Sequence, residues 1–242
     1  MVIVRVHPDL TAVAEAGAAL FAEKAAAAQA ERGMFHVALS GGSTPKAMFR
    51  LLAAEPYLSG IDWSRVSVYW GDERAVGPKS TSSNYRTARE ALLRHVKMPA
   101  AQIFRIEGER DPAAAAADYE ARLRKAWPTA PFPPFDLVYL GMGEDGHTAS
   151  LFPHSEVLTE EQAWVAAVHV PQLDAWRITL TPPAINAARM VVFLVAGADK
   201  AARVQSVLNR EHHEHDQPAQ MIHPQGVLLW LIDEAAGRAK PR

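Results

Sequence analysis

The stretch from 136 to 153, DLVYLGMGEDGHTASLFP, constrains the fold of this chain more than any other. Its apolar run at 137–140 has the length and composition of a buried strand, and three glycines then break the run into a loop. That loop carries Glu144, Asp145 and His147. In open α/β sheets, ligands bind outside the carboxyl ends of the strands, so this loop is the first candidate for a functional site.

The same glycines also allow a different interpretation. Gly141, Gly143 and Gly146 spell G-x-G-x-x-G, the pattern of a dinucleotide-binding turn. Such a turn opens a long helix and is followed by an acidic residue about 20 positions later. Here Pro153 would stop a helix within two turns, and the segment 163–170 contains no acidic residue. The surrounding sequence therefore disfavours dinucleotide binding.

Strand-like and helical patterns recur along the whole chain and predict an α/β fold. Asp9 is a candidate N-cap for an Ala-rich helix to Arg32, Asn84 for an amphipathic helix to about 96, and Asp111 with Pro112 for another helix to about Trp127. A further helix opens at Asp199 and Lys200 and runs to about Leu208. The predicted strands are 2–6, 34–40, 66–71, 103–106, 137–140, 163–170, 176–181, 190–197 and 227–233, with a Pro-rich loop at 129–135 and a loose tail at 235–242.

A glycine turn leads directly into a helix at residues 41–52, GGSTPKAMFRLL. Thr44 is a good N-cap and Pro45 suits the first helical position. The free N–H groups and the positive dipole end at such a helix start suit a phosphate, with Ser43, Thr44 and Lys46 as side-chain donors. An ordinary, well-capped turn explains the pattern equally well.

Four candidate places share one feature, because each directly follows a predicted strand: 41–44, 72–74, 141–147 and 199–200. In a parallel sheet all four would meet along one edge. Taken alone, the charged triplet at 72–74 is better explained as a solvated turn, since charged turn residues are mostly exposed.

Other histidines have simpler explanations. His169 lies in an apolar stretch and is interpreted as a core histidine. The cluster of His212, His213, Glu214, His215 and Asp216 is interpreted as a solvated loop in preference to a metal site.

Composition limits the function classes. The formal net charge of −2 provides no basic stripe for nucleic acid, and the absence of cysteine excludes disulfides and thiolate chemistry. The N-terminal apolar run is too short for a signal peptide, and no stretch approaches a membrane span. We expect one domain, 1–242, in a cytoplasmic protein.

Five segments, in order, resemble the 6-phosphogluconolactonase family. They are GGSTP at 41–45, GDER at 71–74 with the following Ser-Ser-Asn-Tyr to 85, GMGEDGHTASLFP at 141–153, RITLTPP at 177–183, and the segment 197–200. The family belongs to a wider set that includes glucosamine-6-phosphate deaminases and isomerases. The resemblance implies a doubly wound, mostly parallel sheet with helices on both faces.

The resemblance also implies the catalytic residues. It makes His147 the general base and places Asp72 and Arg74 in the catalytic pocket. Histidine suits this role because its ordinary pKa lies near neutrality. Either Asp145 or Asp72 could orient the imidazole ring, and the sequence does not choose between them. Arg74 could polarise the lactone carbonyl or hold a hydroxyl group.

A second group of residues is implied to surround the substrate phosphate: Gly42, Ser43, Thr44, Arg177 and Lys200. The role of Arg177 rests on the resemblance alone, because Arg177 starts a predicted strand. Ser40 and Ser43 lack the G-x-S-x-G context of a serine nucleophile, so direct attack by water is favoured, without cofactor or metal.

The leading functional hypothesis is hydrolysis of 6-phospho-D-glucono-1,5-lactone, a small-molecule substrate, by a monomer or small homo-oligomer. The first alternative is a glucosamine-6-phosphate-type deaminase or isomerase. Against it, Arg74 stands where those deaminases have an aromatic residue, and Ser150, Leu151 and Phe152 replace an acidic-containing stretch. The second alternative is a non-catalytic sugar-phosphate-binding module, although no DNA-binding segment accompanies it.

Overall fold

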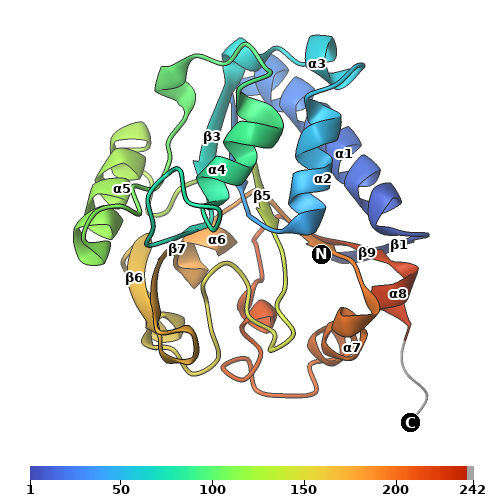
Figure 1. The fold of residues 1–242 in the computed structure, drawn as a ribbon, viewed down its shortest axis with the longest axis vertical. Coiled ribbons are helices and arrows are strands. Elements are labelled where there is room, and N and C mark those ends of the chain that lie inside the picture. The colour runs from blue at the N-terminus through green and yellow to red at the C-terminus, as the bar shows by residue number, and fades with distance from the viewer. Residues whose placement is uncertain (239–242) are drawn as a thin grey trace.

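A parallel sheet forms the centre of the computed structural model, which describes residues 1–238 (Figure 1). Its six strands are all parallel and have the order β1-β9-β8-β5-β2-β3. The bounds are β1 Val2–His7, β2 Phe35–Leu39, β3 Val66–Trp70, β5 Leu137–Leu140, β8 Met190–Val195 and β9 Val227–Asp233. The strands β3 and β5 are buried along their whole length, and β2 and β8 each contain a single partly exposed residue, as expected for a parallel sheet covered on both faces.

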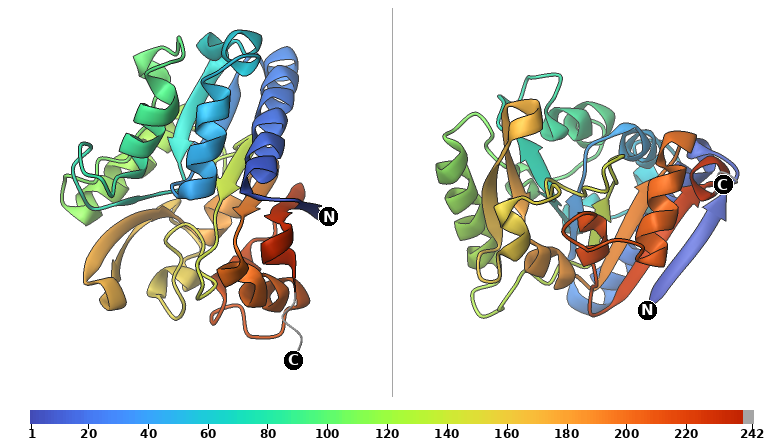
Figure 2. Two further views of the ribbon diagram at one scale, coloured as in Figure 1. Left: turned by 45° about the vertical axis from the view of Figure 1, so that its right-hand side comes forward. Right: turned by 90° about the horizontal axis from the view of Figure 1, so that it is seen from below.

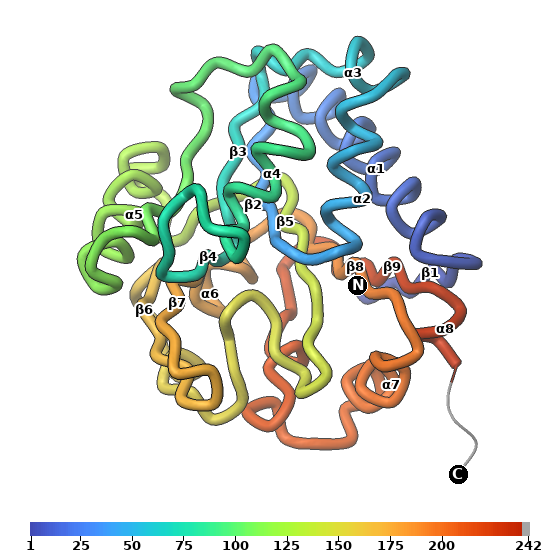
Figure 3. The backbone as a smooth tube through the Cα atoms, in the orientation of Figure 1, coloured from blue at the N-terminus to red at the C-terminus, as the bar shows by residue number. Residues whose placement is uncertain are grey.

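The strand order reverses between β2 and β5. From β2 the chain moves outward to β3, and it then returns to β5 on the other side of β2 before continuing to β8 and β9. This doubly wound arrangement confirms the expected fold class. A reversal of this kind opens a crevice at the carboxyl ends of the two strands, and the loops that follow β2 and β5 run toward the same region (Figure 3).

The long helix α1, Leu10–Arg32, begins at the predicted cap: Asp9 accepts a hydrogen bond from the Ala12 N–H, and Gly33 ends the helix in the left-handed region. Helices α1 and α2 lie side by side against the sheet (Figure 2). The remaining helices are α2 Ser43–Leu52, α3 Tyr57–Gly60, α4 Asn84–Ala88 with a π-helical continuation Arg89–Leu93, α5 Pro112–Ala126, α6 Pro182–Asn186, α7 Ala201–Asn209 and α8 Glu234–Gly237.

A second, antiparallel sheet was not predicted. Its strand order is β4-β7-β6, with β4 Asp72–Arg74, β7 Ala175–Leu180 and β6 Val165–Val170. Helix α5 packs against β6 and β7. The charged triplet at 72–74 is therefore a short strand and not a solvated turn, and the sheet fixes the direction of its side chains.

Several predicted boundaries were wrong. Helix α2 starts at Ser43 with Gly42 as its cap, and Ser83, not Asn84, caps α4. The predicted strand 103–106 contributes only one bridge, from Ile103 to β3. The predicted tail begins with the helical turn α8, and its residues 239–242 lie outside the described part of the chain. None of the helices within 1–238 combines the length and apolarity needed to span a membrane.

Candidate active site

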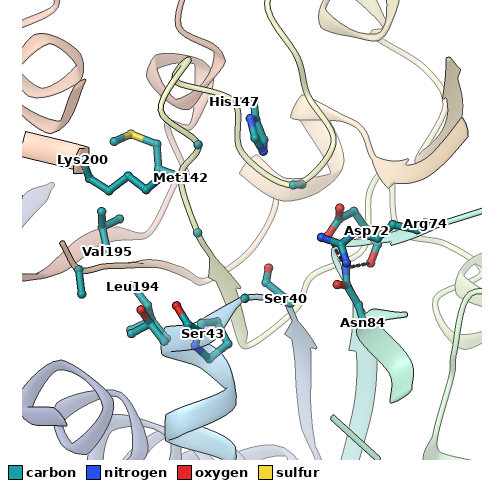
Figure 4. Close-up of a pocket in the computed structure, with 18 residues that line it drawn as sticks. Ser40, Ser43, Asp72, Arg74, Asn84, Met142, His147, Leu194, Val195 and Lys200 are labelled. Carbon is teal, nitrogen blue, oxygen red and sulfur yellow. Dashed lines mark hydrogen bonds between the residues drawn. The ribbon is translucent and has the colours of Figure 1, made fainter. Parts of the chain in front are cut away.

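A cavity of about 280 Å³ lies at the carboxyl ends of the strands, at the point where the strand order reverses (Figure 4). The loop after β2, the strand β4 and the loop after β5 form most of its wall, and the end of β8 closes it. The predicted strand-end segments 41–44, 72–74 and 141–147 thus meet at this cavity, together with Lys200 from the segment 199–200. The residues that carry the argument below are Ser43, Thr44, Asp72, Arg74, Asn84, Gly143, His147 and Lys200.

His147 is held by its own loop. Its Nδ1 lies 2.6 Å from Oδ1 of Asp145, which also accepts a hydrogen bond from the His147 backbone N–H at 3.0 Å. The His147 carbonyl oxygen accepts a hydrogen bond from the Gly143 N–H. With Nδ1 engaged, Nε2 is the nitrogen left for a ligand. Burial raises the pKa of Asp145, but the hydrogen bonds and charge of His147 outweigh it and hold this pKa below its ordinary value.

Gly143 makes this arrangement possible. A Cβ atom at this position would lie 2.2 Å from Nδ1 of His147 and 2.6 Å from Oδ1 of Asp145, far inside contact distance. Any residue with a side chain would therefore displace the histidine–aspartate pair. Gly143 is the second glycine of the G-x-G-x-x-G pattern, and its role here is to let the histidine–aspartate pair pack closely against the backbone. The loop after it does not form the helix that a dinucleotide site needs.

Asp72 contacts other groups than His147. It is only 7% exposed, and its Oδ2 accepts a hydrogen bond from Oγ of Ser150 at 2.7 Å. Its Oδ1 accepts from Nδ2 of Asn84 at 3.1 Å (Figure 4). Asp145 is thus the carboxylate that pairs with the imidazole, while Asp72 faces the cavity from β4. Sequence reasoning missed Asn84 and Ser150 as supports, although both lie within the motifs it selected.

Glu73 has a structural role, because it connects β4 to α4. It is 2% exposed and points away from the cavity, toward the start of α4. Its carboxylate accepts hydrogen bonds from the N–H groups of Arg74, Asn84 and Tyr85 and from the Ser83 hydroxyl. Burial raises the pKa of Glu73, and these hydrogen bonds oppose that effect. Glu73 therefore joins β4 to α4 and fixes the two cavity residues on either side of it.

Glu73→Ala is expected to lower the free energy of unfolding by about 2–4 kcal/mol, because several buried donors lose their acceptor together. Urea denaturation followed by circular dichroism measures the loss. The control is Glu161→Ala, at an exposed position, which should remain within about 0.5 kcal/mol of the wild type. Equal stability of the two variants would contradict the structural role of Glu73.

The start of α2 and Lys200 form the other side of the cavity (Figure 4). Gly42, at φ 110°, turns the chain so that Ser43 and Thr44 begin the helix beside the cavity. The first N–H groups of a helix have no intrahelical partner and carry its positive dipole end. Nζ of Lys200 lies 3.3 Å from Asp199 and 3.7 Å from Glu144. This side of the cavity is suited to an anion.

Arg74 and Arg177 are neighbours on paired strands, since Arg74 of β4 faces Arg177 of β7. Arg74 lines the cavity, whereas Arg177 does not. Burial, together with the charge of Arg74, lowers the pKa of Arg177. The structure therefore brings together every predicted phosphate-binding residue except Arg177.

The remaining histidines lie elsewhere. The expectation that His169 is a core residue was wrong: its side chain is 39% exposed on the β6–β7 hairpin, where Nε2 lies 3.4 Å from Asp174. Among residues 1–238, no three His, Asp or Glu side chains are grouped so that they could hold a metal ion, the cluster at 212–216 included.

The fold and the cavity together define the class of this protein. It is an open α/β protein in which an imidazole–carboxylate pair and an anion-suited helix start face one small cavity at the strand-order reversal.

The family follows from sequence comparison. Residues 8–230 match the model of the glucosamine-6-phosphate isomerase/6-phosphogluconolactonase family, and the chain belongs to this family. A 6-phosphogluconolactonase from Nostoc sp. is 43% identical over 238 residues, covering 97% of this chain and 96% of the relative. One from Haemophilus influenzae is 39% identical, covering 84% and 86%.

Solved structures show the same relationship. The 6-phosphogluconolactonase from Leishmania guyanensis has a TM-score of 0.84 and 30% identity, with all of both chains covered. The enzyme from Trypanosoma brucei has a TM-score of 0.85 and 29% identity, with 98% of this chain and 97% of that chain covered. A monomeric glucosamine-6-phosphate deaminase shares the fold, with a TM-score of 0.79 at 19% identity.

Proposed function

We propose that this chain hydrolyses 6-phospho-D-glucono-1,5-lactone to 6-phospho-D-gluconate, in the oxidative pentose phosphate pathway. The observation that carries the proposal is the placing of the His147–Asp145 pair and the start of α2 around one cavity. The relatives named 6-phosphogluconolactonase support the same reaction, since they match nearly the whole chain.

In the proposed mechanism, Nε2 of His147 takes a proton from a water molecule as the water oxygen attacks the lactone carbonyl carbon. The imidazolium that forms is stabilised by Asp145. The tetrahedral intermediate collapses when the bond from the carbonyl carbon to the ring oxygen breaks. The imidazolium of His147 donates this proton to the departing ring oxygen, which becomes a hydroxyl group. The carbonyl carbon becomes a carboxylic acid that ionises in water.

Other cavity residues are proposed to stabilise the oxyanion and to bind the sugar hydroxyls. In this proposal Arg74, which lines the cavity, interacts with the oxyanion that develops on the carbonyl. Asp72, held by Ser150 and Asn84, is placed to accept hydrogen bonds from sugar hydroxyls. Ser40 is not positioned as a nucleophile, because its hydroxyl donates to the Tyr139 carbonyl oxygen at 2.6 Å. Attack by water therefore remains the mechanism we propose, without cofactor or metal.

The substrate phosphate is proposed to bind at the helix start. The N–H groups and side chains of Ser43 and Thr44 and the ammonium group of Lys200 would hold it and so fix the lactone carbonyl relative to the water. Arg177 would join them by turning its side chain toward the cavity. We further propose that the chain acts as a single domain, 1–242, in the cytoplasm, as a monomer or small homo-oligomer.

The proposal is tested by the initial rate of lactone hydrolysis, with the lactone generated in the assay and the spontaneous rate subtracted. We expect clear acceleration over the spontaneous reaction. Release of ammonia from glucosamine 6-phosphate is measured in parallel and is expected to be absent. Ammonia release without lactone hydrolysis would replace the proposed function by that of a deaminase. Binding of the product without either turnover would indicate a sugar-phosphate-binding module.

Asp145→Asn is expected to lower kcat for lactone hydrolysis by about 10–100-fold, because a hydrogen bond to a charged partner contributes about 1.5–3 kcal/mol. The amide can no longer stabilise the imidazolium by charge. A matched control is Asp174→Asn, since Asp174 pairs with the exposed His169 outside the cavity that holds His147. Equal rates for the wild type and Asp145→Asn would remove Asp145 from the mechanism.

A further inference from the structure

The aromatic ring of Phe152 lies against His147. The two ring centroids are 4.3 Å apart and the ring planes are inclined by 25°, so that the phenyl face covers one face of the imidazole. Phe152 lies five positions after His147 in the sequence and is partly buried. The proposed mechanism gives it no role.

The contacts around the imidazole of His147 distinguish its two ring nitrogens. Asp145 occupies Nδ1 in the plane of the ring, and Phe152 occupies one face. Nε2 then remains for the water molecule. The hydrogen bond at its edge and the stacked ring at one face both restrict rotation of the imidazole about its bond to Cβ, and together they favour one direction of Nε2.

We propose that Phe152 is a positioning residue for His147, which fixes the direction of Nε2 and stabilises the imidazolium that forms during hydrolysis. This inference rests on the proposed function, in which His147 is the general base. The physical basis is the negative face of an aromatic ring, which attracts a cation within about 6 Å of its centroid. Neutral imidazole gains little from this attraction, whereas imidazolium gains from it fully.

The sign of the effect follows from charge. The negative phenyl face attracts the imidazolium that forms during the reaction, as does the Asp145 carboxylate in the same loop. The other charged side chains that line the cavity are Asp72 and Arg74 from β4 and Lys200 from the segment before α7. These four remain in place when Phe152 changes. Loss of the phenyl face alone should therefore destabilise the imidazolium relative to the neutral ring.

The surroundings of Phe152 allow conservative substitution. On its other side, Phe152 lines a separate cavity of about 470 Å³ between the segment 152–157 and the β6–β7 hairpin. Phe152 therefore borders open space. Phe152→Tyr thus keeps the aromatic face, and Phe152→Leu replaces it by an apolar side chain without one.

The experiment measures kcat/KM from pH 5 to 9 for the wild type, Phe152→Leu and Phe152→Tyr. At pH 8 we expect Phe152→Leu to be slower by about 3- to 30-fold, the range that a cation–π contact provides. The midpoint of its acidic limb should fall by about 0.5–1.5 pH units. The deficit should therefore narrow at low pH, and Phe152→Tyr should stay within about threefold of the wild type.

Phe104→Leu is the matched control. Phe104 also stacks on an aromatic ring, that of Tyr69, with centroids 4.6 Å apart, but it lies outside the cavity. This variant should lose stability without a change in the pH profile. Side-chain ¹⁵N NMR titration of His147 gives a second measure that needs no activity.

The outcomes separate the two proposals. An active wild type with an unshifted profile and an unshifted ¹⁵N titration in Phe152→Leu would overturn the role of Phe152 and keep the function. A shifted ¹⁵N titration in a protein that does not hydrolyse the lactone would keep the contact between the rings, remove its catalytic role and overturn the proposed function.

Discussion

His147→Ala is expected to lower kcat/KM for lactone hydrolysis by about 10²–10⁴-fold, the usual contribution of a positioned general base. The alanine variant retains the cavity and the helix start, so KM for the lactone should change much less than kcat. The side chain of His147 is 31% exposed and its removal empties no core position, so the fold should persist. Initial rates with the spontaneous reaction subtracted, measured with a chelator present, give the result.

The control for this prediction is His169→Ala. It removes another histidine that pairs with an aspartate, at the β6–β7 hairpin, and should leave the rate unchanged. If His147→Ala hydrolysed the lactone as fast as the wild type, the reaction would stand but another group would have to activate the water.

Gly143→Ala is expected to reduce kcat by more than about 100-fold, because displacing a catalytic group by about 1 Å can cost that much. The new Cβ would lie 2.2 Å from Nδ1 of His147 and 2.3 Å from its Cε1, so the ring must move. The backbone at this position has an ordinary φ, so the effect is one of space and not of conformation. The thermal midpoint should fall only slightly, since the loop lies at the surface.

The comparison variant for this loss is Gly77→Ala. A Cβ at Gly77 would meet nothing within 4 Å, and its φ is also ordinary. Its rate and thermal midpoint should match those of the wild type. Full activity in Gly143→Ala would mean that the loop relaxes without moving His147. The close approach of His147 to Gly143 would then not be needed for activity.

The carboxyl ends of the strands were the most predictable part of the site. Apolar runs that end in glycine and charge located the loops after β2 and β5, and parallel pairing brought them together. The doubly wound order came from the family resemblance, because periodicity alone cannot order strands. The small sheet escaped prediction since β4 has only three residues, too few for an alternating pattern.

Side-chain pairing was less predictable. Either Asp72 or Asp145 could have supported the histidine, and only the turn geometry around Gly143 brings Asp145 to Nδ1. Ser83 and not Asn84 caps α4, since the Ser83 hydroxyl oxygen accepts a hydrogen bond from the Arg86 N–H, while the Asn84 amide nitrogen donates to Asp72. The apolar composition of its strand predicts a core position for His169, but the residue lies on the exposed face of the strand, between the buried Val168 and Val170.

The pairing of β1 with β9 has a consequence for synthesis on the ribosome. Within the described residues 1–238, β1 lies at the edge of the sheet and pairs there with β9, Val227–Asp233. While the chain is being made, β2, β3, β5 and β8 can already join, but β1 has no neighbouring strand until β9 has emerged. The pairing of β1 with β9 is thus formed late, and premature termination before β9 would leave the valine-rich edge strand without a partner in the sheet.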